Sequence, residues 1–154
     1  MRVAIGYDPN AAGHARAARE VCEGLGIEVA EMCGDDPIYA NTAFRVAGLV
    51  ASGAADRGVL ICGTGIGMSI AANKVKGAYA ALISDAYSAV RAEKSNHANL
   101  ACFGAFTLGV KLFSELLRIW LEAEYAEGTP SAPKIRRIAE YEEERLAGCA
   151  GGRA

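Results

Sequence analysis

The stretch that decides the fold is GVLICGTGIGMSIAANK, which runs from Gly58 to Lys74. It opens with apolar residues typical of a buried strand, passes three alternate glycines and continues in a helical pattern. Gly63, Gly65 and Gly67 permit a tight turn and let the backbone approach a ligand closely. The stretch therefore predicts a strand that ends at Cys62, a glycine-rich turn and a helix.

Short β-rich runs alternate with helical patterns on both sides of this stretch. The predicted strands cover 2–7, 26–33, 57–62, 78–84 and 99–104. The predicted helices cover 10–25, 38–53, 67–75, 85–95, 109–126 and 134–147, with Asn10 as the cap of the first. Strands separated by helices favour βαβ units and a parallel sheet with helices on both faces. Ligands of such sheets bind beyond the carboxyl ends of the strands.

The length of 154 residues fits one domain, predicted over 1–147. A Pro-containing linker precedes its last helix, 134–147, which is heavily charged and carries only a thin apolar stripe. Two interpretations of this helix stay open: it packs on another subunit, or it is mostly solvated. We expect the remaining residues, 148–154, to form a frayed tail.

The composition excludes several classes of partner. A net charge of −2 gives no electrostatic reason to expect nucleic acid. No apolar run reaches the roughly 18 residues that span a membrane, and the apolar part of the N-terminus is too short for a signal peptide. We therefore expect a cytoplasmic protein. Five cysteines without CxxC spacing argue against a disulfide framework or a zinc site, so no metal is predicted.

Cys62 has surroundings that suit a reactive thiol. The free N–H groups of the glycine turn and of the following helix can hold an anion. The same positive helix end favours the thiolate form of a nearby cysteine. From these residues alone, Cys62 is either an activated base or nucleophile, or a buried cysteine beside a structural turn.

A dinucleotide-binding turn is the rival interpretation. It needs the pattern GxGxxG, but the third glycine comes one place early and Met68 stands where it should be. The turn also follows the third predicted strand, although Asp85 lies about where a ribose-binding acid is found. A non-catalytic or nucleotide-binding Rossmann-like module therefore stays open as an alternative.

The run ICGTGIGMSIAANKVKGAYAAL resembles the ribose-5-phosphate isomerase B and galactose-6-phosphate isomerase family. The likeness extends over nearly the whole chain, through VAIGYD, Tyr39, SNHANLACFG and WLEAEY. It implies an α/β, Rossmann-like three-layer αβα sandwich with a five-stranded parallel sheet and an extra C-terminal helix. It also implies a phosphorylated sugar as substrate, no cofactor, and a homodimer or tetramer with active sites at the subunit interface.

The resemblance implies aldose–ketose isomerisation through a cis-enediolate. The residue that matches the family's base is Cys62, and Thr64 is close enough to position it or to relay a hydroxyl proton. The backbone amides from Gly65 to Ser69 would hold the developing oxyanion, and Asn73 on the same helix is a weaker candidate for binding substrate.

Several positions depart from the family pattern. Pro9 stands where the family commonly has His, and Ser95 stands where a His opens the sugar ring. His97, two places on, is a candidate substitute; its other interpretation is a polar surface residue. Phe106 takes the place of an Arg, and only Lys134 remains in register with the family's phosphate-binding residues, with Arg136 and Arg137 close by.

These departures concern the substrate and leave the proton-transfer turn intact. A tetrose 4-phosphate has its ring-forming oxygen esterified and stays open, so it needs no ring-opening residue. The predicted substrate is therefore a tetrose phosphate such as erythrulose 4-phosphate, with ribose 5-phosphate as the other candidate. The predicted catalytic residues are Cys62, Thr64 and His97. The predicted substrate-binding residues are Asp8, Pro9, Tyr39, Gly63, Gly65, Ile66, Gly67, Met68, Ser69, Asn73, Ser95, Asn96, Lys134 and Arg137.

Overall fold

Five parallel strands form the centre of the computed structural model, which describes the backbone of residues 1–150 and the side chains of residues 1–145. The strands are β1 (Arg2–Tyr7), β2 (Glu28–Cys33), β3 (Arg57–Cys62), β4 (Ala80–Leu82) and β5 (Leu100–Gly104), and their order in the sheet is β2-β1-β3-β5-β4. The helices are η1 (Pro9–Ala11), α1 (Ala12–Gly24), α2 (Tyr39–Ala51), α3 (Ile66–Ala72), α4 (Ala86–Lys94), α5 (Val110–Glu122) and α6 (Ala132–Ala150). The predicted α/β fold with its five-stranded parallel sheet is confirmed.

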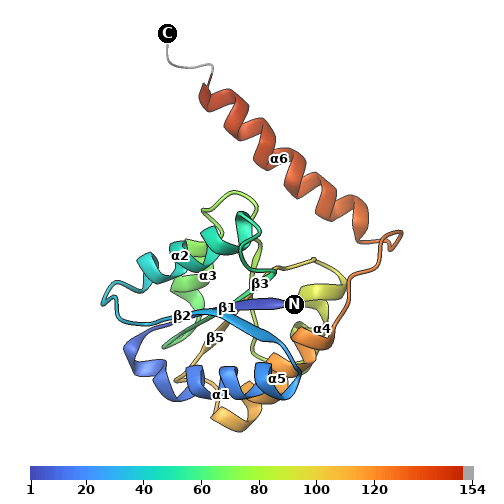
Figure 1. Ribbon diagram of the computed structural model, residues 1–154. Helices are drawn as coiled ribbons and strands as arrows, with labels where there is room; N and C mark the ends of the chain where they lie inside the picture. The colour runs from blue at the N-terminus through green and yellow to red at the C-terminus, as the bar shows by residue number, and fades with distance from the viewer. Residues whose placement is uncertain (151–154) are drawn as a thin grey trace.

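Helices cover both faces of the sheet and give the three layers seen in Figure 1. One core lies under α1, α4 and α5, with Trp120, Phe103 and Phe113 as its largest side chains. The other core lies under α2 and α3 and contains Leu60 and Met68. Because β3 is covered on both faces, its sequence is a continuous apolar run rather than an alternating one.

The pairing of the central strands sets the position of the glycine turn. In the parallel ladder Gly58 pairs with Leu100 and Cys62 pairs with Gly104. The neighbouring strand β1 ends at Tyr7, which pairs with Ile61. The carboxyl ends of β1, β3 and β5 therefore lie side by side at one end of the sheet. Cys62 is on the middle strand of the three.

Most element bounds differ from the prediction by a few residues, and three differences have clear causes. The first helix opens as η1, and its cap is the Asp8 side chain rather than the predicted Asn10; the Asp8 carboxylate accepts from the Asn10 N–H. The edge strand β4 is shorter than predicted because it pairs only with β5. The last helix continues to Ala150, and residues 151–154 of the predicted tail lie outside the described residues.

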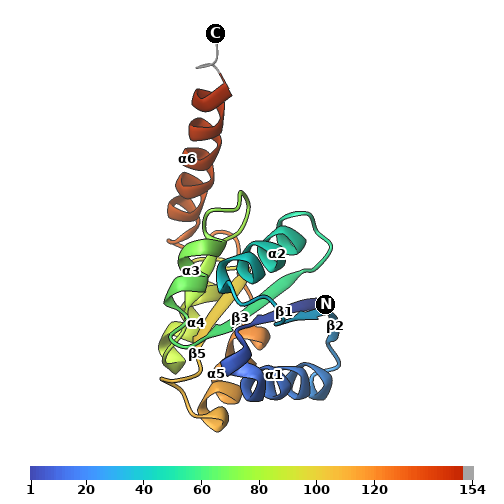
Figure 2. The ribbon, with the colours of Figure 1, turned by 90° about the vertical axis from the view of Figure 1, so that its left-hand side faces the viewer.

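The last helix, α6, stands away from the three layers (Figures 1 and 2). Carboxylates of Glu142 and Glu143 bind the loop before β4, through the Gly77 N–H, the Tyr79 hydroxyl and the Lys76 ammonium group. Ile138 and Tyr141 on this helix are more than half exposed. No described helix is both long and apolar enough to cross a membrane.

Candidate active site

The turn after β3 holds the Cys62 thiol against a backbone amide. The Gly65 N–H donates to Cys62 Sγ at 3.2 Å, and the side chain of Cys62 is buried. Gly65 has a φ of +76°, and a Cβ there would lie 2.8 Å from the carbonyl carbon of Phe103. Only glycine adopts this conformation without strain in such a space. The turn after β3 therefore needs glycine at position 65 to bring the backbone N–H of this residue to Cys62 Sγ.

The first turn of α3 supplies N–H groups that no helical carbonyl can reach. An α-helix leaves its first four N–H groups without intrahelical acceptors. Here the Gly65 N–H binds sulfur, the Ile66 N–H faces Thr64 Oγ1 at 3.4 Å, and the groups of Gly67 and Met68 are the remaining two. The Ser69 N–H donates to the Gly65 carbonyl. The predicted set of amides from Gly65 to Ser69 is therefore too wide, because the helix already uses that of Ser69.

Side chains from two other elements lie against the glycines of this turn. The Tyr39 ring at the start of α2 lies so close to Gly67 that a Cβ there would be 2.6 Å from it. The exposed Phe106 ring stands in the same relation to Gly63, at 2.9 Å. Thr64, which lies between Gly63 and Gly67 in the sequence, is exposed. These residues border a site in which aromatic rings approach the backbone at positions without side chains.

The end of β1 adds Asp8 beside this turn. Its N–H donates to the Ile61 carbonyl, which fixes it next to the end of β3. One carboxylate oxygen accepts from both the Asn10 backbone and side-chain nitrogens, at 3.0 and 2.8 Å. Pro9 follows as the first residue of η1. The geometry therefore gives Asp8 a capping role and leaves its second oxygen for a ligand.

A second thiol, Cys102, lies behind Cys62 on the neighbouring strand β5. Burial and the nearby Cys62 raise the pKa of Cys102 from its ordinary value of 9.0 to about 12, and a hydrogen bond from Ser69 partly opposes this rise. Cys102 thus remains a neutral thiol at physiological pH, and Cys62 is the cysteine of this pair that the turn amide contacts.

Two predicted substrate-binding residues use their side chains for structural contacts. The Asn73 side chain binds both the N–H and the carbonyl of Ala80, at 2.9 and 2.8 Å, and so ties α3 to the edge strand β4. The Met68 side chain is fully buried in the core under α2 and α3. Asn73 therefore has a structural role, whereas Met68, predicted to bind substrate through its backbone amide, keeps that amide at the turn.

His97 does not meet Cys62 within one chain. It lies three residues before β5, whose first residue pairs with Gly58 at the amino end of β3. Cys62 stands four residues further along β3, which is about 13 Å of strand. Cys62 and His97, two of the three predicted catalytic residues, therefore lie at opposite ends of the parallel strands. Only a second copy of the chain could bring them together.

The other predicted phosphate- and sugar-binding residues lie away from the turn as well. Ser95 lines a cavity of about 450 Å³ between the end of α4 and the linker before α6, together with Arg91 and Lys94. The Asn96 amide donates to the Arg91 carbonyl. The remaining two are on α6: Lys134 is exposed, whereas Arg137 forms a two-point ion pair with Glu144, which weakens the prediction that it binds phosphate.

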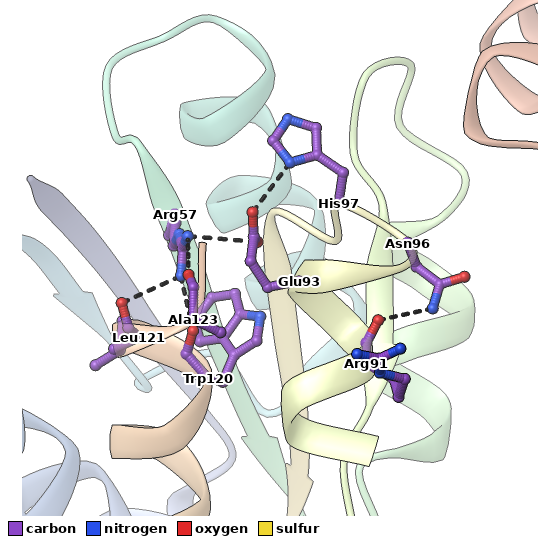
Figure 3. A network of polar contacts seen from close by, with 8 residues as sticks. All are labelled: Arg57, Arg91, Glu93, Asn96, His97, Trp120, Leu121 and Ala123. Atoms are coloured by element: carbon purple, nitrogen blue, oxygen red, sulfur yellow. Dashed lines mark hydrogen bonds and ion pairs between the residues drawn. The ribbon is translucent and has the colours of Figure 1, made fainter. Parts of the chain in front are cut away.

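His97 lies at the end of a buried ion-pair network that the sequence analysis did not single out (Figure 3). The carboxylate of Glu93, which is 3% exposed, contacts His97 Nδ1 at 3.0 Å and Arg57 at 3.4 Å. The signal that could have found Glu93 is its spacing of four residues from His97, which places the two on one face of a helix end. Among the described residues, no group of three or more His, Cys, Asp or Glu side chains could hold a metal ion.

Comparison with known proteins places the chain among sugar-phosphate isomerases. The profile of the family described as Ribose/Galactose Isomerase matches residues 3–138. The chain is 41% identical over 146 residues to D-erythrulose-4-phosphate isomerase of Pectobacterium atrosepticum, which covers 92% of this chain and 95% of that one. It is 40% identical to ribose-5-phosphate isomerase B of Escherichia coli, over 70% and 71% of the two chains. Ribose-5-phosphate isomerase B of Clostridium thermocellum superposes with a TM-score of 0.87 at 34% identity, over 94% and 99% of the chains.

Proposed function

The chain belongs to the ribose/galactose isomerase family and is a sugar-phosphate isomerase, and we propose that it interconverts a ketose and an aldose with Cys62 as the base. The contact that supports this role is the Gly65 N–H on Cys62 Sγ at 3.2 Å. A backbone donor on sulfur stabilises the thiolate, which is the form that accepts a proton.

The reaction runs through a cis-enediolate. The Cys62 thiolate takes a proton from C1 of the ketose, the C–H electrons form the C1–C2 double bond, and the carbonyl oxygen on C2 becomes an oxyanion. The hydroxyl proton on O1 then passes to O2, and Cys62 returns its proton to C2 as the C1 carbonyl forms. One proton has moved between carbons and one between oxygens, so the ketose and the aldose differ in nothing else.

The amides at the start of α3 supply the charge stabilisation that this step needs. Gly67 and Met68 have N–H groups without helical acceptors, and they lie beside the Cys62 turn. Donors fixed at the place where negative charge develops are worth about 3 kcal/mol each in other enzymes. The Thr64 hydroxyl, exposed at the same turn, is placed to position the substrate beside Cys62.

A tetrose 4-phosphate such as erythrulose 4-phosphate is the substrate we favour. The observation that carries this choice is Ser95 at the position of the family's ring-opening histidine. An open-chain tetrose 4-phosphate needs no ring opening, so the loss costs nothing for that substrate. A relative that matches nearly the whole chain is named for erythrulose 4-phosphate, which supports the same choice.

The complete site requires two copies of the chain. Cys62 and His97 lie at opposite ends of neighbouring strands in one sheet, so a site that contains both takes them from different subunits. We therefore propose a homodimer in which each site combines the Cys62 turn of one subunit with Ser95, Asn96 and His97 of the other. Lys134, at the start of α6, is the cation on that side that we assign to the phosphate.

An assay of the purified protein across phosphorylated tetroses, pentoses and hexoses tests this proposal. The expected result is the highest kcat/KM for the erythrulose 4-phosphate and erythrose 4-phosphate pair. A much higher kcat/KM for ribose 5-phosphate would remove the tetrose assignment and leave the isomerase assignment standing. Tight binding of a dinucleotide without turnover of any sugar phosphate would overturn both.

A further inference from the structure

The residue that closes helix α4 is a histidine in an unusual backbone conformation. His97 has a φ of +48°. Among the residues that the structure describes, it is the only one other than glycine with a positive φ. Its N–H donates to the Glu93 carbonyl at 2.9 Å. Glycine is the usual residue in a left-handed position after a helix, so a side chain there implies strain that other contacts must offset.

The His97 ring is held on two sides. Nδ1 lies 3.0 Å from the Glu93 carboxylate, and the ring stacks against Tyr125 with centroids 4.4 Å apart. The side chain is nevertheless 57% exposed. Figure 3 shows the second ring nitrogen on the side turned away from Glu93. A histidine held in this way presents one nitrogen, Nε2, to whatever approaches the surface.

Glu93 is itself fixed by a chain of buried contacts. Its second oxygen lies 3.4 Å from the Arg57 guanidinium. Arg57 in turn donates to the carbonyls of Trp120 and Ala123 at the end of α5, at 2.8 and 3.1 Å, and stacks on the Trp120 ring. The carboxylate therefore cannot turn away from His97 without breaking a buried ion pair.

We propose that Glu93 is a positioning residue that fixes the tautomer of His97, so that Nε2 exchanges a proton with the substrate in the partner's site. A carboxylate paired with arginine only accepts hydrogen bonds, so Nδ1 must carry the hydrogen and Nε2 its lone pair. Nε2 takes the proton of the O1 hydroxyl and delivers it to O2, so no atom is gained or lost. The inference rests on the proposed function, because it needs a second subunit's Cys62.

Nitrogen NMR of the imidazoles tests the positioning without reference to activity. The chain has two histidines, and the other, His14, has its Nε2 on the Leu108 carbonyl at 2.8 Å. At a pH where both rings are neutral, we expect His97 with hydrogen on Nδ1 and His14 with hydrogen on Nε2. H14N assigns the two signals. E93L should release His97 to the opposite tautomer, whereas E93Q, which keeps an acceptor oxygen, should retain the first.

Kinetics of the same variants connect the tautomer to the reaction. We expect E93L to lower kcat by at least about tenfold with little change in KM, H97A to lower it as far, and E93Q to restore most of it. In the H97A background, E93L should cause no further loss.

An unchanged His97 tautomer in E93L, or a full further loss in the H97A background, would overturn the positioning role. Absence of any sugar-phosphate turnover by the wild type would instead contradict the proposed function, and the NMR result would still decide the role of Glu93.

Discussion

The environments of Cys62 and Cys102 differ although both lie on the face of the sheet under α2 and α3. Cys62 ends its strand and receives the Gly65 N–H, whereas Cys102 sits within β5 and is fully buried. Burial raises the pKa of Cys102 to about 12. Two residues of the same type thus have different contacts because one lies at the end of its strand and the other within its strand.

Substitution of Cys62 should separate the chemistry from the fold. We expect C62A to lower kcat by about 10²-fold or more, since general-base catalysis supplies about 10² to 10⁴. Circular dichroism and the urea midpoint should change little, because alanine fits the small buried site at the end of β3. The matched control is C22A, which removes a buried thiol on the opposite face of the sheet. Wild-type turnover by C62A would remove Cys62 as the base.

The buried thiols should also make the protein less stable in alkali. Burial raises the pKa of Cys22 to about 11 and of Cys102 to about 12, from ordinary values of 9.0. Above pH 9 the unfolded chain loses these protons before the folded chain does. The unfolding free energy should therefore fall between pH 9 and 11, by about 1.4 kcal/mol per pH unit for each thiol.

Urea titrations at pH 8, 9, 10 and 11 measure this effect. In C102A the slope of unfolding free energy against pH should be shallower by the share of one thiol, with no change of slope below pH 8. An identical slope in wild type and C102A would show that Cys102 ionises as easily in the folded chain as in the unfolded one.

The glycine turn and helix α3 act as one element, because the turn conformation places the helix amides beside the sulfur. G65A should lower the unfolding free energy by more than about 2 kcal/mol, since a left-handed residue with a Cβ is strained and would approach the Phe103 backbone. G48A, in the open middle of α2, is the control and should raise it by about 0.5–1 kcal/mol. Equal effects of the two substitutions in urea unfolding would contradict this description of the turn.

Arg57 joins strand β3 to the end of α5 and to α4. R57M removes the partner of the buried Glu93 carboxylate and the donor to the α5 carbonyls. Loss of one member of a buried ion pair costs about 3–5 kcal/mol, and the urea midpoint should fall accordingly. R118M, which removes an exposed pair with Glu122, should change stability by less than about 1 kcal/mol. A loss of that small size in R57M would mean that the network contributes little to the fold.

Local patterns predicted the elements well where one interaction dominates. The bounds of β1 and β3 match the predicted ranges, because long apolar runs buried on both faces leave little choice of register. The turn residues that approach Cys62 also followed from the glycine spacing. The tie between Asn73 and Ala80 could not be predicted, because it depends on where the edge strand β4 lies in the sheet.

At the scale of the whole molecule, strand order separates two residues that the sequence analysis assigned to one site. His97 and Cys62 belong to motifs that suggest one site, yet the parallel pairing of β3 and β5 places them at opposite ends of these strands. Strand direction and order decide this separation, and neither is visible in a local motif. The proposed homodimer, in which each site takes residues from two subunits, accommodates both residues.

A shared site predicts complementation between two inactive variants. C62A and H97A homodimers should each turn over slowly. After the two are unfolded together and refolded, half of the dimers contain one site with both residues intact. Activity should rise to about a quarter of the wild-type value, because such dimers restore one of their two sites. No gain over the separate variants would contradict a site built from two subunits.

The most direct test of the central claim is a competition between a tetrose and a pentose phosphate. Equal concentrations of erythrulose 4-phosphate and ribulose 5-phosphate are incubated with one sample of enzyme, and proton NMR follows the consumption of both. The ratio of the two rates gives the ratio of the kcat/KM values directly. We predict that the tetrose phosphate is consumed first, with both rates lost in C62A; faster consumption of the pentose phosphate would contradict the claim.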